Sequence, residues 1–190
     1  MRFTTMTKTL LLAAMVIIVM TTMMSNSQIA FAASAEEIDK DSTAALENLY
    51  QIKPESKKMG HSAKGILIFP KIVKAGLLIG GEGGEGALRE RGKTVAYYRS
   101  SAASYGLQAG VQSFGYVLFF MDQASLQYLS SSEGWEIGTG PSVVVADDGF
   151  GKNVSSTTLQ KGIYAFIYGQ KGLMAGIGLK GSKIKKIEPK

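Results

Sequence analysis

The spacing of glycine limits the folds open to this chain of 190 residues more than any other feature. Its 23 glycines disfavour long helices, because a glycine inside a helix costs about 1 kcal/mol relative to alanine. The pattern G-[LW]-x-[IA]-G occurs at residues 76–80, 106–110, 134–138 and 172–176. In a strand each copy would place its glycines on one face and two apolar residues on the other. The repeat therefore predicts a small, strongly curved sheet whose glycines let backbones approach closely.

Further segments have the β-branched and aromatic composition of strands and are bounded by turn-forming residues. They are residues 65–69, 94–98, 117–121, 142–146 and 163–168. Residues 91–93 (RGK) and 147–149 (DDG) have the composition of hairpin turns. These patterns predict an α+β fold: a glycine-rich, strongly curved antiparallel sheet or small barrel, with an N-terminal amphipathic helix and one or two further short helices.

Two helices are predicted from their caps and apolar spacing. Ser34 and Glu37 form a capping box, Pro54 ends the helix that follows, and the apolar residues at helical spacing are Ile38, Ala45, Leu46, Leu49 and Ile52. A shorter helix runs from Asp122, its N-cap, to the serines at 130–132. The apolar stripe of the first helix either covers the core of the domain or detaches to face a membrane. The acids on its polar face disfavour contact with an anionic bilayer.

The N-terminal segment has the features of a signal peptide. Two basic residues precede an apolar run at residues 10–20, and residues 30–32 (AFA) fit a cleavage site. The run is shorter than the roughly 20 apolar residues that span a bilayer. We therefore expect residues 1–32 to be removed and residues 33–190 to form one exported domain, periplasmic or secreted. The alternative is an uncleaved amphipathic anchor.

Charge is unevenly distributed along the expected domain. Residues 33–55 hold six acids against two lysines, whereas residues 56–190 carry a net charge of +8. A basic surface attracts anionic lipid headgroups by about 1 kcal/mol for each well-placed Lys or Arg. It would also attract nucleic acid, which an exported protein rarely meets, so a membrane surface is the expected partner. In the alternative interpretation the lysines are solvated and keep a glycine-rich surface soluble.

The composition excludes several kinds of chemistry. With no cysteine, the chain has no disulfide, no cysteine-ligated metal site and no lipid-modified N-terminus of the lipoprotein type. The single histidine, His61, excludes histidine-rich metal sites, and the chain has no G-x-S-x-G elbow to supply a serine nucleophile. A hydrolase that pairs His61 with a serine is therefore a minor alternative, and we expect no enzyme activity and no cofactor.

Residues 81–86 (GEGGEG) superficially match a dinucleotide-binding loop. We reject that interpretation, because Glu82 and Glu85 would repel a pyrophosphate and only five residues separate the loop from Gly92, too few for the required helix. We expect a flexible or bulged hairpin arm instead, and no nucleotide. The paired acids at 82 and 85, and those at 147 and 148, lack the ligand spacing of a calcium loop.

A group of aromatic residues is expected in the core, because exposing them would reduce solubility. They are Phe114, Tyr116, Phe119, Phe120 and Trp135. The competing hypothesis for function uses the same rings: a soluble periplasmic protein that holds a small apolar ligand in a cavity beneath them.

Five segments closely resemble the SYLF domain, also called the Ysc84 domain, and occur in the family's order. They are residues 64–70 (KGILIFP), 75–86, 104–112 (SYGLQAGVQ), 134–145 and 168–176 (YGQKGLMAG). The resemblance spans roughly residues 44–187 and implies a lipid-binding module. Eukaryotic members bind phosphoinositides with basic residues and an N-terminal amphipathic segment, and some bind actin filaments. Bacterial members are exported, often as lipoproteins.

With the charge pattern, the resemblance implies an exported bacterial member that binds anionic phospholipid reversibly and electrostatically. This chain departs from the lipoprotein members because it lacks the acylated cysteine, so peripheral rather than permanent membrane association is expected. The actin partner is not carried over, because an exported protein of the bacterial kind does not meet actin. The residues expected to contact lipid are Lys64 and Lys171, inside matching motifs, and, on charge alone, Lys57, Lys58, Lys71 and Lys74.

Overall fold

The computed structural model describes residues 33–77, 79–105, 110–146, 161–172 and 178–190. The chain divides into two compact units, and the second, Ala33–Lys190, contains every element described below. Three helices occur among the described residues: α2 (Ala35–Ile52), α3 (Pro54–Ser62) and α4 (Gln123–Ser131). None of these three is both long enough and apolar enough to cross a bilayer.

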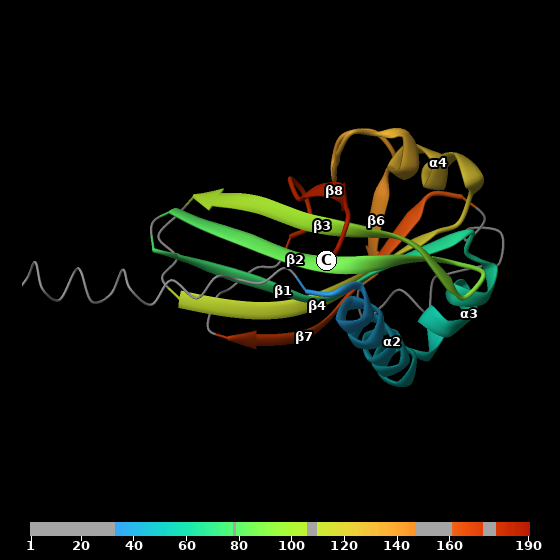
Figure 1. The fold of residues 1–190 in the computed structure, drawn as a ribbon, viewed down its shortest axis with the longest axis horizontal. Helices are drawn as coiled ribbons and strands as arrows, with labels where there is room; N and C mark the ends of the chain where they lie inside the picture. Colours follow the sequence, from blue (N-terminus) through green and yellow to red (C-terminus); the bar gives the residue numbers. More distant parts are fainter. Residues whose placement is uncertain (1–32, 78, 106–109, 147–160, 173–177) are drawn as a thin grey trace, which may run out of the picture. The chain divides into compact units, whose positions relative to one another are not determined.

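Among the same residues eight strands form one sheet, in the order β5-β8-β3-β2-β1-β4-β7-β6. Their bounds are β1 (Gly65–Leu77), β2 (Ile79–Glu90), β3 (Lys93–Tyr105), β4 (Gly110–Phe120), β5 (Trp135–Glu136), β6 (Val143–Ala146), β7 (Ile163–Gly172) and β8 (Lys183–Ile187). The sheet curves strongly into a half-barrel, with α2 and α3 against one face (Figure 1). The predicted fold class is therefore confirmed, although β6 and β7 pair in parallel where only antiparallel pairs were expected.

The five predicted strands match β1, β3, β4, β6 and β7 to within one residue of the observed bounds or lie inside them. Composition did not single out the glycine-rich β2 or the short β5 and β8 as strands. The turn at Arg91 and Gly92 is confirmed, with positive φ angles of 50° and 79° and with Glu90 paired to Lys93. The other expected turn, at residues 147–149, lies outside the described residues.

The glycine repeat has more than one role. Its first copy forms the β1–β2 hairpin, where Gly76 pairs with Gly80, so the prediction of a continuous strand there is wrong. Two glycines allow this reversal, because a Cβ atom on Gly76 would lie 2.5 Å from the Cα of Gly80. In the third copy Trp135 and Ile137 are buried and Glu136 between them is exposed, as a strand requires. The other two copies fall largely outside the described residues.

Glycines in β2 let the sheet bend. The facing strand β1 carries a bulge, and its backbone folds closely over β2 at that point. A Cβ atom on Gly86 would lie 2.1 Å from the carbonyl oxygen of Ile68, and one on Gly84 would lie 2.2 Å from that of Lys71. These glycines therefore sit in a hairpin arm beside a bulge. The arm leads into β3 and not into the helix that a dinucleotide-binding loop requires.

A buried hydrogen bond crosses the concave face of the sheet. The hydroxyl of Tyr116 on β4 donates to Oγ of Ser100 on β3 at 2.7 Å. Because β1 and β2 lie between these strands, a flat sheet would hold them about 14 Å apart. The bond thus depends on the curvature. Burial raises the pKa of Tyr116, an effect that the hydrogen bond with Ser100 partly opposes.

The core has two parts, on opposite faces of the sheet. The concave part buries four of the aromatic residues: Phe114, Tyr116, Phe120 and Trp135. The other part contains Phe119 and residues of α2. Within the concave part, Trp135 donates from Nε1 to the carbonyl oxygen of Thr139 at 2.9 Å, and its ring meets Phe120 edge-on. The prediction that these rings form the core is confirmed.

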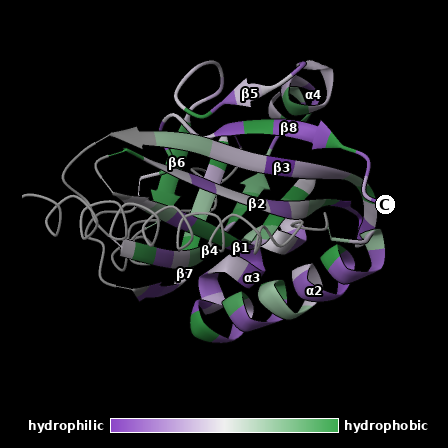
Figure 2. Cartoon of the chain, turned by 60° about the vertical axis from the view of Figure 1, so that its left-hand side comes forward, coloured by the Kyte–Doolittle hydropathy of each residue, from purple (hydrophilic) through white to green (hydrophobic). Residues whose placement is uncertain are grey.

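Helix α2 begins at the predicted cap, where Oγ of Ser34 accepts the N–H of Glu37 at 3.2 Å. The helix buries three residues of its predicted apolar stripe: Ile38, Ala45 and Leu49. Ile52 is 50% exposed, so its assignment to the buried stripe is wrong. Hydrophilic and hydrophobic residues alternate along the helix (Figure 2).

Polar contacts also fasten α2 to the sheet. The carboxylate of Asp39 accepts the hydroxyls of Thr94 at 2.7 Å and Tyr97 at 3.0 Å, both on β3. From β2, Nη2 of Arg89 donates to the carbonyl oxygen of Asp39 at 3.1 Å and to Oγ1 of Thr43 at 2.6 Å. These contacts favour the interpretation in which α2 covers the core over the one in which it detaches.

The other two helices differ in how well they were predicted. Helix α2 ends before Pro54 as expected, but Pro54 also begins α3, a helix that was not predicted. Proline suits the first turn of a helix, because a backbone N–H at that position would have no partner within the helix and proline lacks one. The second predicted helix is confirmed as α4. Asp122 caps it by accepting the N–H of Ser125 at 2.8 Å, and it accepts the N–H of Gly162 at 2.6 Å as well.

We predict that Gly86→Ala destabilises the protein by about 1–3 kcal/mol, because the new methyl group overlaps the Ile68 carbonyl oxygen and the Phe69 ring. Urea unfolding followed by circular dichroism measures the change. Gly81→Ala on the same strand is the control, since its Cβ would lie 3.8 Å from the nearest atom, and it should change the free energy of unfolding by less than about 0.5 kcal/mol. Equal losses in the two variants would contradict the close approach.

Stability should fall in alkaline solution because Tyr116 and Tyr168 are buried and their pKa values are raised. Below pH about 10 both tyrosines are neutral in the folded and unfolded chain, so their contribution is fully present. Above it the unfolded chain ionises first, and each buried tyrosine lowers the free energy of unfolding by up to about 1.4 kcal/mol per pH unit. Urea unfolding at rising pH should show a shallower decline for Tyr116→Phe, and an unchanged slope would contradict this assignment.

Candidate functional site

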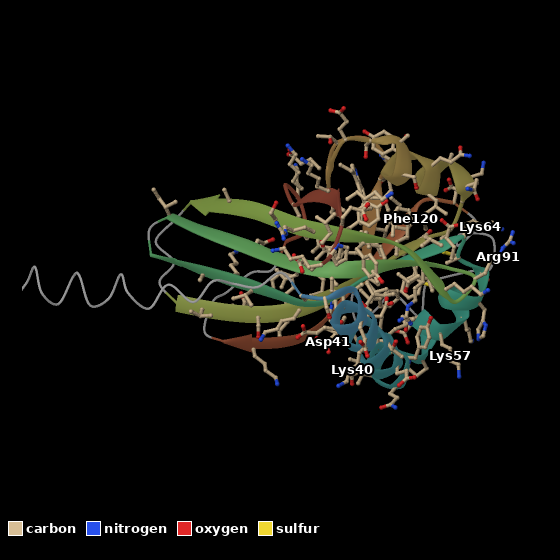
Figure 3. The ribbon with its side chains drawn as sticks, viewed as in Figure 1. Lys40, Asp41, Lys57, Lys64, Arg91 and Phe120 are labelled. Atoms are coloured by element: carbon tan, nitrogen blue, oxygen red, sulfur yellow. The ribbon has the colours of Figure 1, made fainter. Side chains whose placement is uncertain are left out.

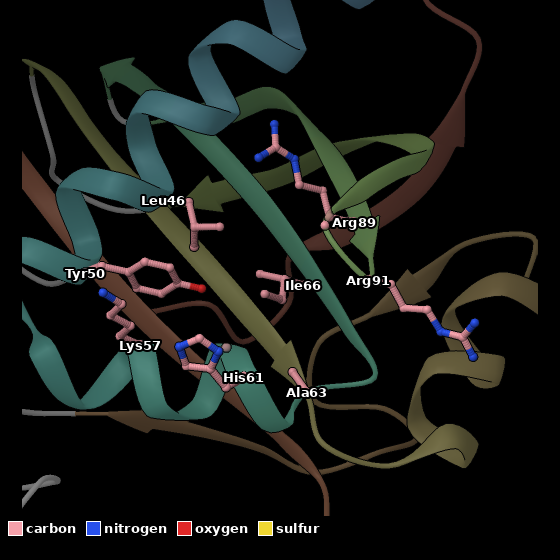
Figure 4. Close-up of a pocket in the computed structure, with 10 residues that line it drawn as sticks. Leu46, Tyr50, Lys57, His61, Ala63, Ile66, Arg89 and Arg91 are labelled. Atoms are coloured by element: carbon pink, nitrogen blue, oxygen red, sulfur yellow. The ribbon is translucent and has the colours of Figure 1, made fainter.

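A notch opens between α2, α3 and the turn that joins β2 to β3 (Figure 4). It encloses about 380 Å³. Leu46, Ala63 and Ile66 contribute apolar wall, and the polar side chains around it are Tyr50, Lys57, His61, Arg89 and Arg91. None of the described residues that line it carries a carboxylate. We call this site the cationic notch.

Three separate parts of the chain supply the polar side chains. Tyr50 comes from α2, Lys57 and His61 come from α3, and the two arginines come from the end of β2 and the turn after it. Tyr50, Lys57 and His61 lie close together, while Arg89 extends toward α2 and Arg91 extends away at the rim (Figure 4). The arrangement can hold an anion against one apolar wall.

Arg89 is held in place by α2, yet one of its donors is unused. Its Nη2 donates to Asp39 and Thr43, whereas its Nε is buried and has no hydrogen-bond partner within the described part of the chain. A buried donor without a partner costs about 1–3 kcal/mol. An anionic oxygen that reached this atom would recover part of that cost.

Tyr50 supplies a hydroxyl that stays protonated near neutral pH. Burial raises its pKa, and the charge of Arg89 partly opposes the rise. The ring lies across α3 at a glycine: a Cβ atom on Gly60 would sit 2.1 Å from the hydroxyl oxygen. Gly60 is therefore required for packing inside α3, because any side chain there would overlap Tyr50.

The six lysines predicted to contact lipid form two groups. Lys57 lines the notch, Lys58 follows it on α3, and Lys64 lies just past the end of that helix. Lys57, Lys64 and Arg91 all lie at the end of the domain where α3 is found (Figure 3). The remaining three lie on the sheet: Lys71 and Lys74 on β1 and Lys171 on β7. Of the six, only Lys57 lines the notch; Lys58 and Lys64 lie on or next to α3, and the other three lie on the sheet.

Glu82 and Glu85 have separate partners on β2. Glu82 lies opposite Lys74 and accepts the hydroxyl of Ser182 at 3.2 Å; burial raises its pKa, while Lys74 and Ser182 oppose the rise. Glu85 pairs with Arg99 on β3. No cluster of three or more His, Asp or Glu side chains fit to hold a metal ion occurs in the described residues.

Sequence analysis missed Tyr50 and Arg89 as site residues, and it treated Arg91 only as part of a turn. The missing information was the register of the sheet. β1 begins directly after α3 and pairs with β2 in the antiparallel sense, so Ile66 lies opposite Arg89. The end of β2 therefore lies next to the start of β1, close to α3. Pairing β1 with β2 as a hairpin at the sequence level would have placed Arg89 there.

The other functional hypotheses gain little from the geometry. His61 is exposed in the last turn of α3, and no serine lines the notch with it among the described residues. A second cavity of about 410 Å³ lies beside β6, with Ile137, Val143 and Leu179 in its wall. None of the five core aromatic rings lines either cavity, so no described cavity lies beneath them.

The two arginines should respond differently to replacement. We expect Arg89→Gln to lower the free energy of unfolding by about 1.5–3 kcal/mol, because it loses charged hydrogen bonds to α2. Arg91→Gln is the matched control on the exposed turn and should change it by less than about 0.5 kcal/mol. Urea unfolding compares them, and an equal loss in both would show that Arg89 does not fasten α2.

Comparison with known proteins supports the resemblance seen in the sequence. Residues 101–188 match the family model of Ysc84, described as the Las17-binding protein actin regulator. The match includes β4, α4, β7 and β8 and ends just before the last two residues of the chain. A search of the curated proteins found no match. Ysc84 is a family of binding domains and is not known for enzymatic activity. Residues 101–188, which are 88 of the chain's 190 residues, thus match the Ysc84 (SYLF) domain.

Proposed function

We propose that this protein binds the headgroups of anionic phospholipids at a bilayer surface, reversibly and without catalysis, through the cationic notch. The observation that carries the proposal is the combination of several cations and no lining carboxylate with a buried, unpartnered Nε on Arg89. Arginine side chains bind phosphate oxygens through paired hydrogen bonds, and lysine side chains bind them as point charges. The apolar wall would receive the glycerol region next to the phosphate.

Charge at this end of the domain supports attraction to a membrane. Lys57 and Arg91 line the notch and are exposed, and two further exposed lysines lie on or next to α3: Lys58 and Lys64. Each well-placed cation contributes about 1 kcal/mol near an anionic surface, and salt weakens the attraction. A few such contacts give peripheral and reversible binding. They do not give the permanent attachment that an acylated cysteine provides.

The family match and the notch occupy different parts of the chain. The Ysc84 match begins at residue 101, whereas the residues of the notch lie between positions 46 and 92. The family description supports a binding role for the domain, and the geometry of the notch supports the class of ligand. The sheet lysines Lys71, Lys74 and Lys171 lie outside the notch, and we keep them as a second candidate contact surface for lipid.

The proposal also places the protein outside the cytoplasm. Its basis is the signal-peptide pattern in residues 1–32, with an apolar run and a small-residue cleavage site. In that compartment, periplasmic or extracellular, anionic phospholipid is present at membrane surfaces. The actin partner in the family description is not proposed for this chain, because an exported protein would not meet it.

Vesicle co-sedimentation tests the proposed binding. Removing two notch cations in Lys57→Gln/Arg91→Gln should weaken binding to phosphatidylglycerol-containing vesicles roughly 30-fold, because each contributes about 1 kcal/mol. Lys183→Gln/Lys185→Gln on β8 removes the same charge elsewhere and should weaken binding much less. Binding of the parent protein should rise with the anionic lipid fraction and fall with salt.

Three results would contradict the proposal in different ways. Equal pelleting with neutral and anionic vesicles would exclude electrostatic binding. Equal losses for the notch and β8 variants would show that only net charge matters. A loss confined to Lys71→Gln/Lys171→Gln would move the contact surface from the notch to the sheet.

A further inference from the structure

The first residue of the compact unit contacts a carboxylate on the sheet. The backbone N–H of Ala33 donates to Oε2 of Glu85 at 3.2 Å, and Ser34 then caps α2. The other carboxylate oxygen of Glu85 binds Arg99, and the side chain of Glu85 is only 15% exposed. Ala33 is also where the second compact unit of the chain begins.

The sequence places a cleavage motif immediately before this contact. Residues 30–32 read Ala-Phe-Ala, the small-x-small pattern that signal peptidases recognise. Hydrolysis of the peptide bond between residues 32 and 33 consumes one water molecule. It leaves a carboxylate on Ala32 and an α-ammonium group on Ala33, at the nitrogen that already faces Glu85.

We propose that a signal peptidase cleaves this bond and that Glu85 holds the new α-ammonium group of Ala33. Cleavage turns a neutral N–H donor into an ammonium group, so that the hydrogen bond to the carboxylate also becomes an attraction between two opposite full charges. The start of α2 is therefore held more tightly on β2 after processing than before it. This assigns a role to Glu85 that is independent of lipid binding.

The surrounding charges are compatible with this pairing. Arg99, on β3, is 52% exposed and shares the carboxylate by binding its other oxygen. Glu36 and Glu37, in the first turn of α2, are exposed and add negative charge near the new terminus. Glu82, three residues away on β2, is engaged with Ser182 and Lys74 instead. Glu85 is thus the carboxylate that the structure places at Ala33.

The position of cleavage is tested first. The full chain is expressed in a bacterial host, and the exported product is purified and examined by intact mass and N-terminal sequencing. We expect a mature N-terminus at Ala33. An exported product that retains residues 1–32, or that begins at a different residue, would overturn the proposal.

The contact itself is tested by the reactivity of the new amine. Limited reductive methylation of the mature protein, read by peptide mass spectrometry, compares Ala33 with the exposed Lys40 as internal reference. Held by Glu85, the amine should react roughly tenfold more slowly than in Glu85→Gln. Glu82→Gln is the matched control on the same strand and should leave the rate at Ala33 unchanged.

A second measurement keeps the test valid if Glu85→Gln does not fold. The mature wild-type protein is labelled in its native state and again in urea, and the rate at Ala33 is normalised to Lys40 in both. The ratio should rise on unfolding. An unchanged ratio, or equal native rates in wild type and Glu85→Gln, would show that Glu85 does not hold the terminus.

Discussion

The curvature of the sheet is the constraint on which the rest of the structure depends. It arises where the bulged backbone of β1 crosses Gly84 and Gly86 of β2 at distances that no side chain allows. Because the sheet bends there, Ser100 and Tyr116 meet across two intervening strands. The same bend leaves an outer face on which α2 lies, and α2 in turn forms one wall of the cationic notch. A few glycines thus determine both the core and the site.

Much of this architecture follows from local sequence. The cap at Ser34, the cap at Asp122 and the Arg91–Gly92 turn were all predicted correctly, because each depends on residues next to one another in the chain. The glycine-rich part of β2 was predicted only as a flexible or bulged hairpin arm, because glycine has low strand propensity, and pairing with β1 and β3 makes it a regular strand. The first glycine repeat was misread for a related reason, since a pair of glycines fits a reversal as well as a strand.

The site was harder to predict than the fold. The prediction from charge chose lysines without regard to their place in the fold. It could not tell that Lys57 lies in a notch and Lys71 on the sheet. The arginines were overlooked because their importance depends on strand register and on contacts with α2 that are some fifty positions away in sequence, such as Arg89 with Asp39. Register and long-range contacts are properties of the assembled sheet. A single sequence shows them only once the hairpin of β1 and β2 has been identified.

The environment of Trp135 makes this fold convenient to follow by optical spectroscopy. It is the single tryptophan of the chain, it is 1% exposed, and it lies on β5 opposite Ile184 of β8. Its fluorescence therefore reports the edge of the sheet where β5 pairs with the C-terminal strand β8, while far-ultraviolet dichroism reports the secondary structure of the whole domain. Any separation between the two signals during denaturation would identify that edge as an independent cooperative segment.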